Sequence, residues 1–441
     1  MRKENHFEKY LGFSQQLHKN SQKTTFYKMK ITQALCRQHL GRMIKFNWFM
    51  ATKKRPLETH TEFHLAKMGI PIVDPLDIVN PIKERIDVSQ YFEHMPNQPP
   101  IPKDENHPDY KLRPCLKVMG HDLLVQGTQQ AQVLTKSLLI KDSLPEKVES
   151  LLENTSEEVD ETVQRIIRSS NIYDAHQEKI PKRKNPEKPA WNYPRDYGLT
   201  DIRKSRNLTI KMLQLCETLC GFNVAQQRQI IHNGLVQVPL VKDGDLVEFS
   251  MKMDLLMTSM IPLTPMGSTA DAADKTLPEL YPLLSTAGLR RYHFYDLKLL
   301  YPIAQGSPWS TPHTIFIYHD CQRVKNLTEI PVEQDQLFAR SLIEAFATTA
   351  TYARQKYGDS VEDLPEPLAV QCVHVDGQNF HFSVFQLNTL NIEEKEGKMN
   401  YWWCSPQISL FEQAKYENAR PVLEGYNPDV FKRLLAFYKN V

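Results

Sequence analysis

The sequence predicts an α+β protein, in which a mixed sheet with β-hairpins packs against helices and an extended arm precedes this body. The first observation is residues 368–390, where alternating apolar residues flank Asp376-Gly377, a dipeptide strongly preferred in tight hairpin turns. The second is residues 332–357, where leucine, phenylalanine and alanine recur at helical spacing. Gly358 follows, where a helix commonly ends. Because the hairpin's aromatic and β-branched side chains must be buried, we expect this helix to cover them.

Composition sets the broad class. A chain of 441 residues is long enough for roughly three domain-sized units, and 41% hydrophobic with 24% charged residues is ordinary for a globular protein. No apolar run approaches the roughly 18 residues that a membrane span needs. The seven cysteines are scattered and odd in number, which favours a reducing compartment over a disulfide framework.

The N-terminal segment is strongly basic. Residues 9–57 contain eleven Lys or Arg and no Asp or Glu, a composition typical of a mitochondrial transit peptide. We therefore predict a targeting segment at 1–57, with the residues before Met29 an upstream extension if Met29 is the working start. A basic arm that stays on the protein is the alternative. Residues 1–50 carry ten cations and two acids, so their removal changes the net charge from +2 to −6, and any nucleic-acid contact must then be local.

Residues 58–127 are predicted to form a proline-rich extended arm. The stretches 69–81 and 95–110 are dense in proline, which excludes long helices and central strands. A disordered linker is the alternative, although isoleucine and valine side chains in the first stretch offer anchors.

Residues 128–441 are predicted to form one mixed α+β body, because no glycine-serine linker divides them. Helical periodicity, capping residues and a second Asp-Gly turn at Asp243-Gly244 define its elements. The predicted helices cover 131–140, 155–167, 200–220 and 427–440. A further helix is predicted to start within 143–148, and a short one to run from Asn223 to about 233. The predicted strands cover 235–241, 246–253, 292–300 and 314–319, with a loop over 258–290.

Within this body, residues 179–206 are basic and rich in aromatic residues. The segment has nine Lys or Arg against three acids, four prolines, and three interleaved aromatic side chains. Prolines keep such a segment extended, cations neutralise phosphates, and aromatic rings stack on unpaired bases. A solvated loop or a basic run of the nuclear-import kind is the alternative. The candidate RNA-binding residues are Lys182, Arg183, Lys184, Lys188, Trp191, Tyr193, Arg195, Arg203, Lys204 and Arg206.

The sequence shows no motif for catalysis or cofactor binding. Glycine-rich phosphate loops, GxSxG and HExxH are all absent. His60 and His64 have helical i, i+4 spacing but no third metal ligand nearby. Cys216 and Cys220 share this spacing in an apolar helix, where buried thiols are expected.

Two further sets of residues carry side chains that are common in active sites. His374 and His381 flank the main hairpin and are expected to face each other as ordinary sheet residues. Asp296, Ser307 and His313 are common residues in loops, and their types alone do not indicate a triad. We therefore predict no catalytic residue, no metal and no cofactor, and hence no enzyme.

Several short motifs, in this order along the chain, resemble one family. They are Leu134–Lys136, Leu144–Val148, Ile180–Arg183, Tyr295-Asp296, Pro312–Thr314, Asp335–Leu337, Val370-Gln371, Asp376-Gly377, Phe380–Phe382, Val384–Thr389 and the terminal-helix residues Pro428, Phe431, Leu435 and Tyr438. Because of these motifs, the chain resembles the mitochondrial large-subunit ribosomal protein family numbered thirty-seven from about Gly69 onward. This family shares its fold with programmed cell death protein nine. Residues 1–28 and about 240–290 depart from the pattern.

The resemblance implies a structural constituent of the mitochondrial large ribosomal subunit, located in the matrix. The implied partners are mitochondrial ribosomal RNA and other large-subunit proteins, with no membrane span and no small-molecule substrate. Two alternatives from other classes are a matrix enzyme with an unrecognised site and a free RNA-binding factor.

Overall fold

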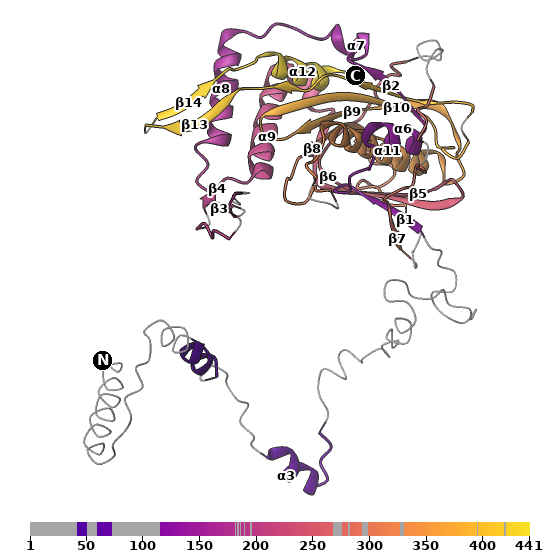
Figure 1. Ribbon diagram of the computed structural model, residues 1–441. Helices are drawn as coiled ribbons and strands as arrows, with labels where there is room; N and C mark the ends of the chain where they lie inside the picture. The colour runs from indigo at the N-terminus through magenta and orange to yellow at the C-terminus, as the bar shows by residue number, and fades with distance from the viewer. Residues whose placement is uncertain are drawn as a thin grey trace. The chain divides into compact units, whose positions relative to one another are not determined.

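The computed structural model describes residues 42–50, 60–72, 115–180, 182, 185, 187–188, 190–194, 196–267, 276–280, 283–292, 299–326, 330–394, 396–418 and 420–441 (Figure 1). The chain divides into two units, residues 1–87 and 88–441. In the first unit, residues 42–50 are helical, and α3 (Thr61–Lys67) is a second short helix that buries no side chain.

The second unit is an α+β structure, which confirms the predicted fold class. Its strands are β1 (Cys115–Met119), β2 (Ser137–Lys141), β3 (Glu178–Lys179), β4 (Tyr197–Gly198), β5 (Arg228–Lys242), β6 (Asp245–Ser259), β7 (Arg290–Tyr292), β8 (Thr311–Tyr318), β9 (Asp363–Val375), β10 (Asn379–Thr389), β11 (Asn400–Cys404), β12 (Ile408–Ser409), β13 (Gln413–Glu417) and β14 (Arg420–Glu424). Its helices are α6 (Gly127–Thr135), α7 (Glu146–Glu149), α8 (Glu157–Asn171), α9 (Asp201–Cys220), α10 (Phe222–Ala225), α11 (Gln334–Tyr357) and α12 (Asp429–Lys439).

Among the described residues, the main sheet has ten strands in the order β2-β11-β10-β9-β8-β6-β1-β7, with β5 also paired to β6 and β12 to β10. The pairs β1–β6, β8–β9 and β2–β11 are parallel, and the hairpin pairs are antiparallel. The strands β13 and β14 form a separate two-stranded ribbon, as do β3 and β4. The sheet is therefore mixed, as predicted.

Both predicted Asp-Gly hairpins are confirmed. In the β9–β10 turn, the Asp376 carboxylate accepts the backbone N–H groups of Gln378 and Asn379 at 2.9 and 2.6 Å, and Gly377 has a φ of +97°. In the β5–β6 turn, Asp243 and Gly244 both have positive φ, the geometry that favours this dipeptide.

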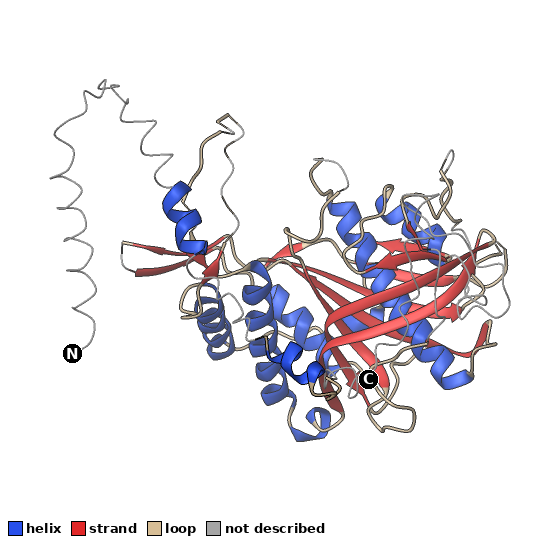
Figure 2. Ribbon diagram, turned by 90° about the horizontal axis from the view of Figure 1, so that it is seen from below, coloured by secondary structure: helices blue, strands red, loops and turns tan. Residues whose placement is uncertain are grey.

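Helices cover both faces of the main sheet (Figures 1 and 2). α11 and α6 pack on one face, and Figure 1 shows the sheet curving around α11. Because of this curvature the Phe346 ring of α11 contacts Phe249 of β6 at a centroid distance of 5.2 Å and Phe385 of β10 at 6.1 Å. The other face packs against α7, α8, α9 and α12. The core on this side buries the aromatic side chains of Phe316, Tyr318, Phe380, Phe382, Tyr401, Trp403, Phe411 and, from α12, Phe431, Phe437 and Tyr438.

The helix predicted at 332–357 is α11, and its ends have clear physical causes. Glu333 and Gln336 form a reciprocal capping box at its start. Gly358 follows its last residue with a φ of +98°, a backbone conformation that glycine adopts without strain. The strand predicted at 314–319 and the helix predicted at 427–440 are also confirmed, as β8 and α12.

Two predicted helices are wrong in part. The helix expected over 131–140 ends at Thr135, and residues 137–141 form β2, because Lys136 adopts a left-handed conformation. The Lys136 ammonium fixes this turn by donating to the carbonyl oxygens of Asn391 and Glu396 at 3.3 and 2.6 Å. The helix expected from Asn223 to about 233 is only the four-residue α10. Residues 228–233 instead begin β5, because the long strand β6 provides them with a pairing partner.

The segment 58–127, predicted as an extended arm, contains the helix α3 and the strand β1, which pairs parallel to β6. Residues 73–114 of that segment lie outside the described residues, as do residues 293–298 of the strand predicted at 292–300.

Candidate nucleic-acid interface

The basic-aromatic segment, residues 178–198, which we call the lobe, begins at β3 and ends at β4, and most of its described residues are exposed. The two-residue strands β3 and β4 pair antiparallel at its base, and the Ile180 N–H donates to the Asp196 carbonyl at 3.0 Å. In Figure 1 the lobe lies at the lower ends of α8 and α9.

An ion pair fixes the base of the lobe to α9. Arg203 donates to both carboxylate oxygens of Asp174, with Nε at 2.5 Å and Nη2 at 3.0 Å. Asn207, one turn later, donates to the same carboxylate at 2.7 Å. The Arg203 hydrogen bonds hold the pKa of Asp174 well below its usual range. Asp174 therefore remains ionised and joins the chain entering the lobe to the helix that follows it.

The lobe presents aromatic rings beside cations. Trp191 is 61% exposed, and the Lys188 ammonium lies 4.7 Å from its ring centroid, a cation–π contact. Tyr193 is tilted by 47° against this indole, with 6.3 Å between ring centroids. At the base, the Lys179 ammonium lies 6.0 Å from the exposed Tyr197 ring. This is an accessible stacking surface within a cationic loop, which is what binding of unpaired nucleotides requires.

The structure brings part of the predicted RNA-binding set together. Lys182, Lys188, Trp191 and Tyr193 lie in the lobe, where the Lys182 ammonium is 3.4 Å from Asn192 Oδ1. Three predicted residues, Arg183, Lys184 and Arg195, lie outside the described residues.

The remaining three predicted residues lie in the first two turns of α9. Arg203 donates hydrogen bonds to the Asp174 carboxylate through Nε and Nη2. Lys204 forms an ion pair with Asp201 at 3.3 Å. Arg206 is exposed.

A groove of about 670 Å³ adjoins the base of the lobe. Its walls are residues of α9, Glu178 of β3, and the turn after β8, which contributes Asp320, Gln322 and Arg323. Arg323 is 75% exposed and pairs with Asp320 at 3.4 Å. This turn was not among the predicted site residues, because no local sequence pattern connects it with residues more than a hundred positions earlier. Since the groove mixes arginines with carboxylates, the lobe is the more cationic of the two surfaces.

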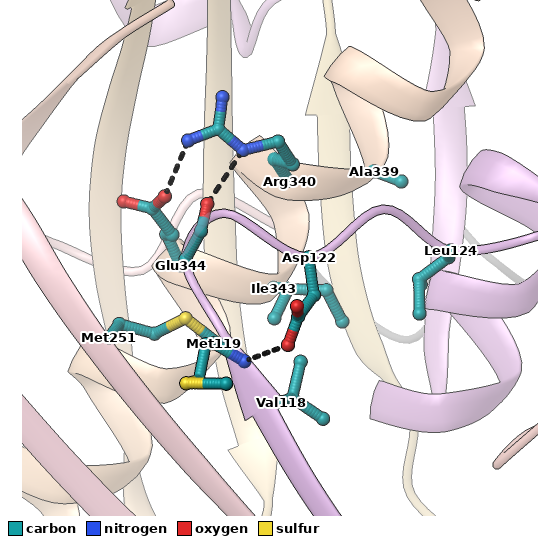
Figure 3. A pocket seen from close by; sticks show the side chains of 10 residues that line it. Val118, Met119, Asp122, Leu124, Met251, Ala339, Arg340, Ile343 and Glu344 are labelled. Carbon is teal, nitrogen blue, oxygen red and sulfur yellow. Dashed lines mark hydrogen bonds and ion pairs between the residues drawn. The ribbon is translucent and has the colours of Figure 1, made fainter. Parts of the chain in front are cut away.

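A second cavity lies beneath α11 and has room for about one water molecule, with a volume of about 10 Å³ (Figure 3). Arg340 donates to the Gly120 carbonyl at 2.8 Å and lies 3.5 Å from Glu344. Burial raises the pKa of Glu344 to about 8. The cavity is too small for an organic ligand, so this cluster is a buried polar contact between helix and sheet.

His313, His374, His381 and Cys216 lie in the buried core or in the sheet. His313 is fully buried with its Nε2 2.8 Å from the Asn440 carbonyl, and Asp296 lies outside the described residues. His374 and His381 are directly paired across β9 and β10, as predicted. Cys216 lies on the buried face of α9. No group of three potential metal ligands occurs in the part of the chain that the structure describes.

Comparison with known proteins identifies the class. A family model described as mitochondrial 28S ribosomal protein S30 (PDCD9) matches residues 322–441, which contain α11, the β9–β10 hairpin and α12. Large ribosomal subunit protein mL37 of Gallus gallus is 28% identical over 353 residues, covering 77% of either chain. The Bos taurus protein of the same name is 27% identical over 357 residues, covering 77% of this chain and 78% of its own.

These matches are to ribosomal proteins. More particularly, the chain is homologous to large ribosomal subunit protein mL37 over about three quarters of its length, and the resemblance predicted from the motifs is confirmed. The same relatives agree with the prediction that the protein is not an enzyme. Among the described residues, no helix is long and apolar enough to cross a bilayer.

Proposed function

We propose that this protein is a structural constituent of the mitochondrial large ribosomal subunit, bound to ribosomal RNA and neighbouring ribosomal proteins in the matrix. The observation that carries the proposal is the homology to mL37, which covers 77% of this chain and 77% of the Gallus gallus relative. In this proposal residues 1–57 target the chain to mitochondria, and the rest of the chain assembles with the subunit.

The lobe and the first turns of α9 are the proposed RNA contacts. The proposal includes all ten predicted residues: Lys182, Arg183, Lys184, Lys188, Trp191, Tyr193, Arg195, Arg203, Lys204 and Arg206. The residues 178–198 carry six cations and three acids, so the lobe attracts phosphates even though the chain as a whole is nearly neutral. Trp191 supplies a stacking surface, and the Asp174–Arg203 pair holds the lobe in place.

Replacing Lys182, Arg183 and Lys184 together with alanine is expected to reduce incorporation into the large subunit. Removing three phosphate contacts should also lower the slope of log affinity against log salt by about 2, since single strands lose about 0.7 per contact. Incorporation is measured by sedimentation of the tagged protein from mitochondrial lysate, and the salt slope with purified protein and RNA.

A matched control replaces three lysines outside the lobe, Lys398, Lys415 and Lys432, which form ion pairs at the surface. This variant should incorporate normally, because such exposed pairs contribute little stability. Equal incorporation of the lobe variant and the control would refute the RNA assignment. Protein that stays at the top of the gradient, whether or not the RNA is intact, would refute the ribosomal role itself.

Replacing Trp191 with alanine tests the stacking contact by itself. Base stacking on an aromatic side chain is worth about 1–3 kcal/mol, so the affinity for single-stranded RNA should fall at least about fivefold, with a much smaller effect on duplex RNA. Fluorescence anisotropy with labelled single-stranded and duplex RNA measures both. Tyr416→Ala is the control, because Tyr416 is 60% exposed on the β13–β14 ribbon and lies outside the lobe. Equal losses for both RNA forms would contradict stacking on an unpaired base.

A further inference from the structure

A pocket of about 380 Å³ lies where the parallel strands β2 and β11 end, and we call it the strand-end pocket. Lys141 and Cys404 are the last residues of these strands, they are partners in register, and both line the pocket. Small-molecule sites typically measure about 300–1,000 Å³, and in open sheets they often lie at the carboxyl ends of parallel strands. The lining also includes the first turns of α6 and α11. Its main side chains are Leu139, Lys141, Glu333, Asp335, Phe338 and Trp402.

Part of the lining is aromatic and contains a buried donor without a partner. Phe338 of α11 and Trp402 of β11 line the pocket together with Leu139 of β2. Trp402 is fully buried, and its Nε1–H has no hydrogen-bond acceptor among the described residues. An indole nitrogen is a donor only, and it usually has a partner when it is buried. A flat ring with an acceptor atom would both stack against these side chains and accept this hydrogen bond.

The lining next to Trp402 carries no charge at neutral pH. His381 Nε2 lies 2.9 Å from the Cys404 Sγ, and the Phe338 ring stacks on His381 with 3.9 Å between ring centroids. Burial lowers the pKa of His381 to about 3 and raises the pKa of Cys404 to about 12. The imidazole is therefore neutral and the thiol protonated, so this side of the pocket supplies binding groups and no thiolate nucleophile.

The charged groups at the pocket balance one another. Glu333 caps the first turn of α11, and Asp335 accepts the Thr128 N–H and hydroxyl, in the first turn of α6, at 2.8 and 2.5 Å. The two carboxylates thus lie at the positive ends of two helices, and Lys141 adds one exposed cation. A ligand with a net charge would upset this balance. A carboxylate has about four acceptor positions, so oxygen lone pairs remain for hydroxyl donors of a ligand.

We infer that the strand-end pocket binds an uncharged aromatic heterocycle that carries hydroxyl groups, a nucleoside-like molecule. A ring nitrogen accepts the Trp402 N–H, the ring packs beside Phe338, and the hydroxyl groups donate to Glu333 or Asp335. With one ring and a few hydrogen bonds, the dissociation constant should be on the order of 0.1–1 mM. This inference goes beyond the ribosomal role and does not depend on it, because it is tested on the isolated chain.

The test is isothermal titration calorimetry of the purified full chain with adenosine as the probe. Adenosine should bind saturably at one site. Adenosine monophosphate, which adds a charged phosphate, and benzamidine, a planar aromatic cation, should bind at least about tenfold more weakly, because an unbalanced charge loses its hydration in the pocket. Trp402→Phe retains an aromatic ring without the N–H and should weaken adenosine binding about fivefold, the usual effect of one hydrogen bond. Leu139→Trp fills part of the pocket and should abolish saturable binding.

Trp309→Phe is the matched control, because Trp309 lies outside the pocket and its Nε1 donates to the Gln226 carbonyl at 3.0 Å. It should bind adenosine like the unaltered chain. Circular dichroism checks that each variant folds, and either pocket variant alone suffices for the test. No saturable binding at about 10 mM adenosine would overturn the inference, since a millimolar ligand would then nearly fill the site. Unchanged affinity in a folded pocket variant would also overturn it. Adenosine monophosphate that binds as tightly as adenosine would overturn the assignment of an uncharged ligand.

Discussion

Replacing Arg228 with methionine is expected to lower the free energy of unfolding by about 3 kcal/mol or more. The change removes a buried, charged hydrogen-bond donor and leaves its acceptors unpaired. Arg228 is only 9% exposed at the start of β5. Its guanidinium donates to Ser259 Oγ at 2.5 Å and to the carbonyl oxygens of Asn440 and Tyr438 at 2.7 and 3.4 Å. The change removes these contacts together while roughly preserving side-chain volume.

The size of this effect follows from the position of Arg228 at the C-terminal end of α12. The last carbonyl groups of a helix have no partners within the helix, and in α12 they are satisfied by side chains from distant strands. Gln371 of β9 donates to the Phe437 carbonyl at 2.9 Å, and the Asn440 side chain donates back to Gln371 at 3.0 Å. Without Arg228, the buried end of α12 loses its strongest donor, and the helix should separate more easily from the sheet.

Urea unfolding followed by circular dichroism measures the loss. Arg323→Met is the matched control, because Arg323 is 75% exposed, and it should change stability by less than about 0.5 kcal/mol. Arg228→Lys should recover only part of the loss, because one ammonium group cannot reproduce the planar fork of a guanidinium. A decrease below about 1 kcal/mol for Arg228→Met would show that water replaces its hydrogen bonds, contrary to the expectation.

The features predicted from sequence are those that neighbouring residues determine. Both Asp-Gly hairpins follow from local turn chemistry, and α11 follows from its own periodicity and its capping box. The lobe was found by composition, since its cations, prolines and aromatic rings are adjacent in the chain. Such features need no knowledge of the tertiary fold.

The features that were missed depend on partners far away in the chain. β2 exists as a strand because β11 pairs with it more than 250 residues later, and the first half of β5 is extended because β6 continues beside it. Arg323 reaches the groove beside the lobe only through the placement of β8 in the sheet. A short apolar run fits a helix or a strand equally well until its partner is known.

The buried Glu344 gives the second large prediction. Burial raises the pKa of its carboxyl from 4.5 to about 8, although the Arg340 guanidinium 3.5 Å away favours the ionised form. The unfolded chain releases this proton near its ordinary pKa, whereas the folded chain retains it until the higher one. Between these values the folded state binds more protons, so Glu344 makes the protein less stable as the pH rises. Asp254 of β6, whose pKa burial also raises, acts in the same direction.

Buried histidines act in the opposite direction. Burial lowers the pKa of His313 and His381 from 6.5 to about 3, and it lowers the pKa of His374, beside Arg340, as well. Below their ordinary pKa the unfolded chain binds more protons than the folded chain, so acid destabilises the protein through each of them. His313 and His381 should each cost about 2 kcal/mol of stability on going from neutral pH to about pH 5.

Replacing Glu344 with glutamine is therefore expected to stabilise the protein by about 3 kcal/mol at about pH 8 and to have little effect near pH 5. Glutamine keeps an oxygen acceptor for Arg340 and cannot ionise. The variant should consequently lose stability steeply on acidification, because the histidine contribution is no longer opposed by that of Glu344. Urea unfolding at several pH values measures both profiles. Glu161→Gln on the exposed face of α8 is the control and should leave the profile unchanged. Parallel profiles for Glu344→Gln and the unaltered chain would mean that Arg340 keeps Glu344 ionised within the fold.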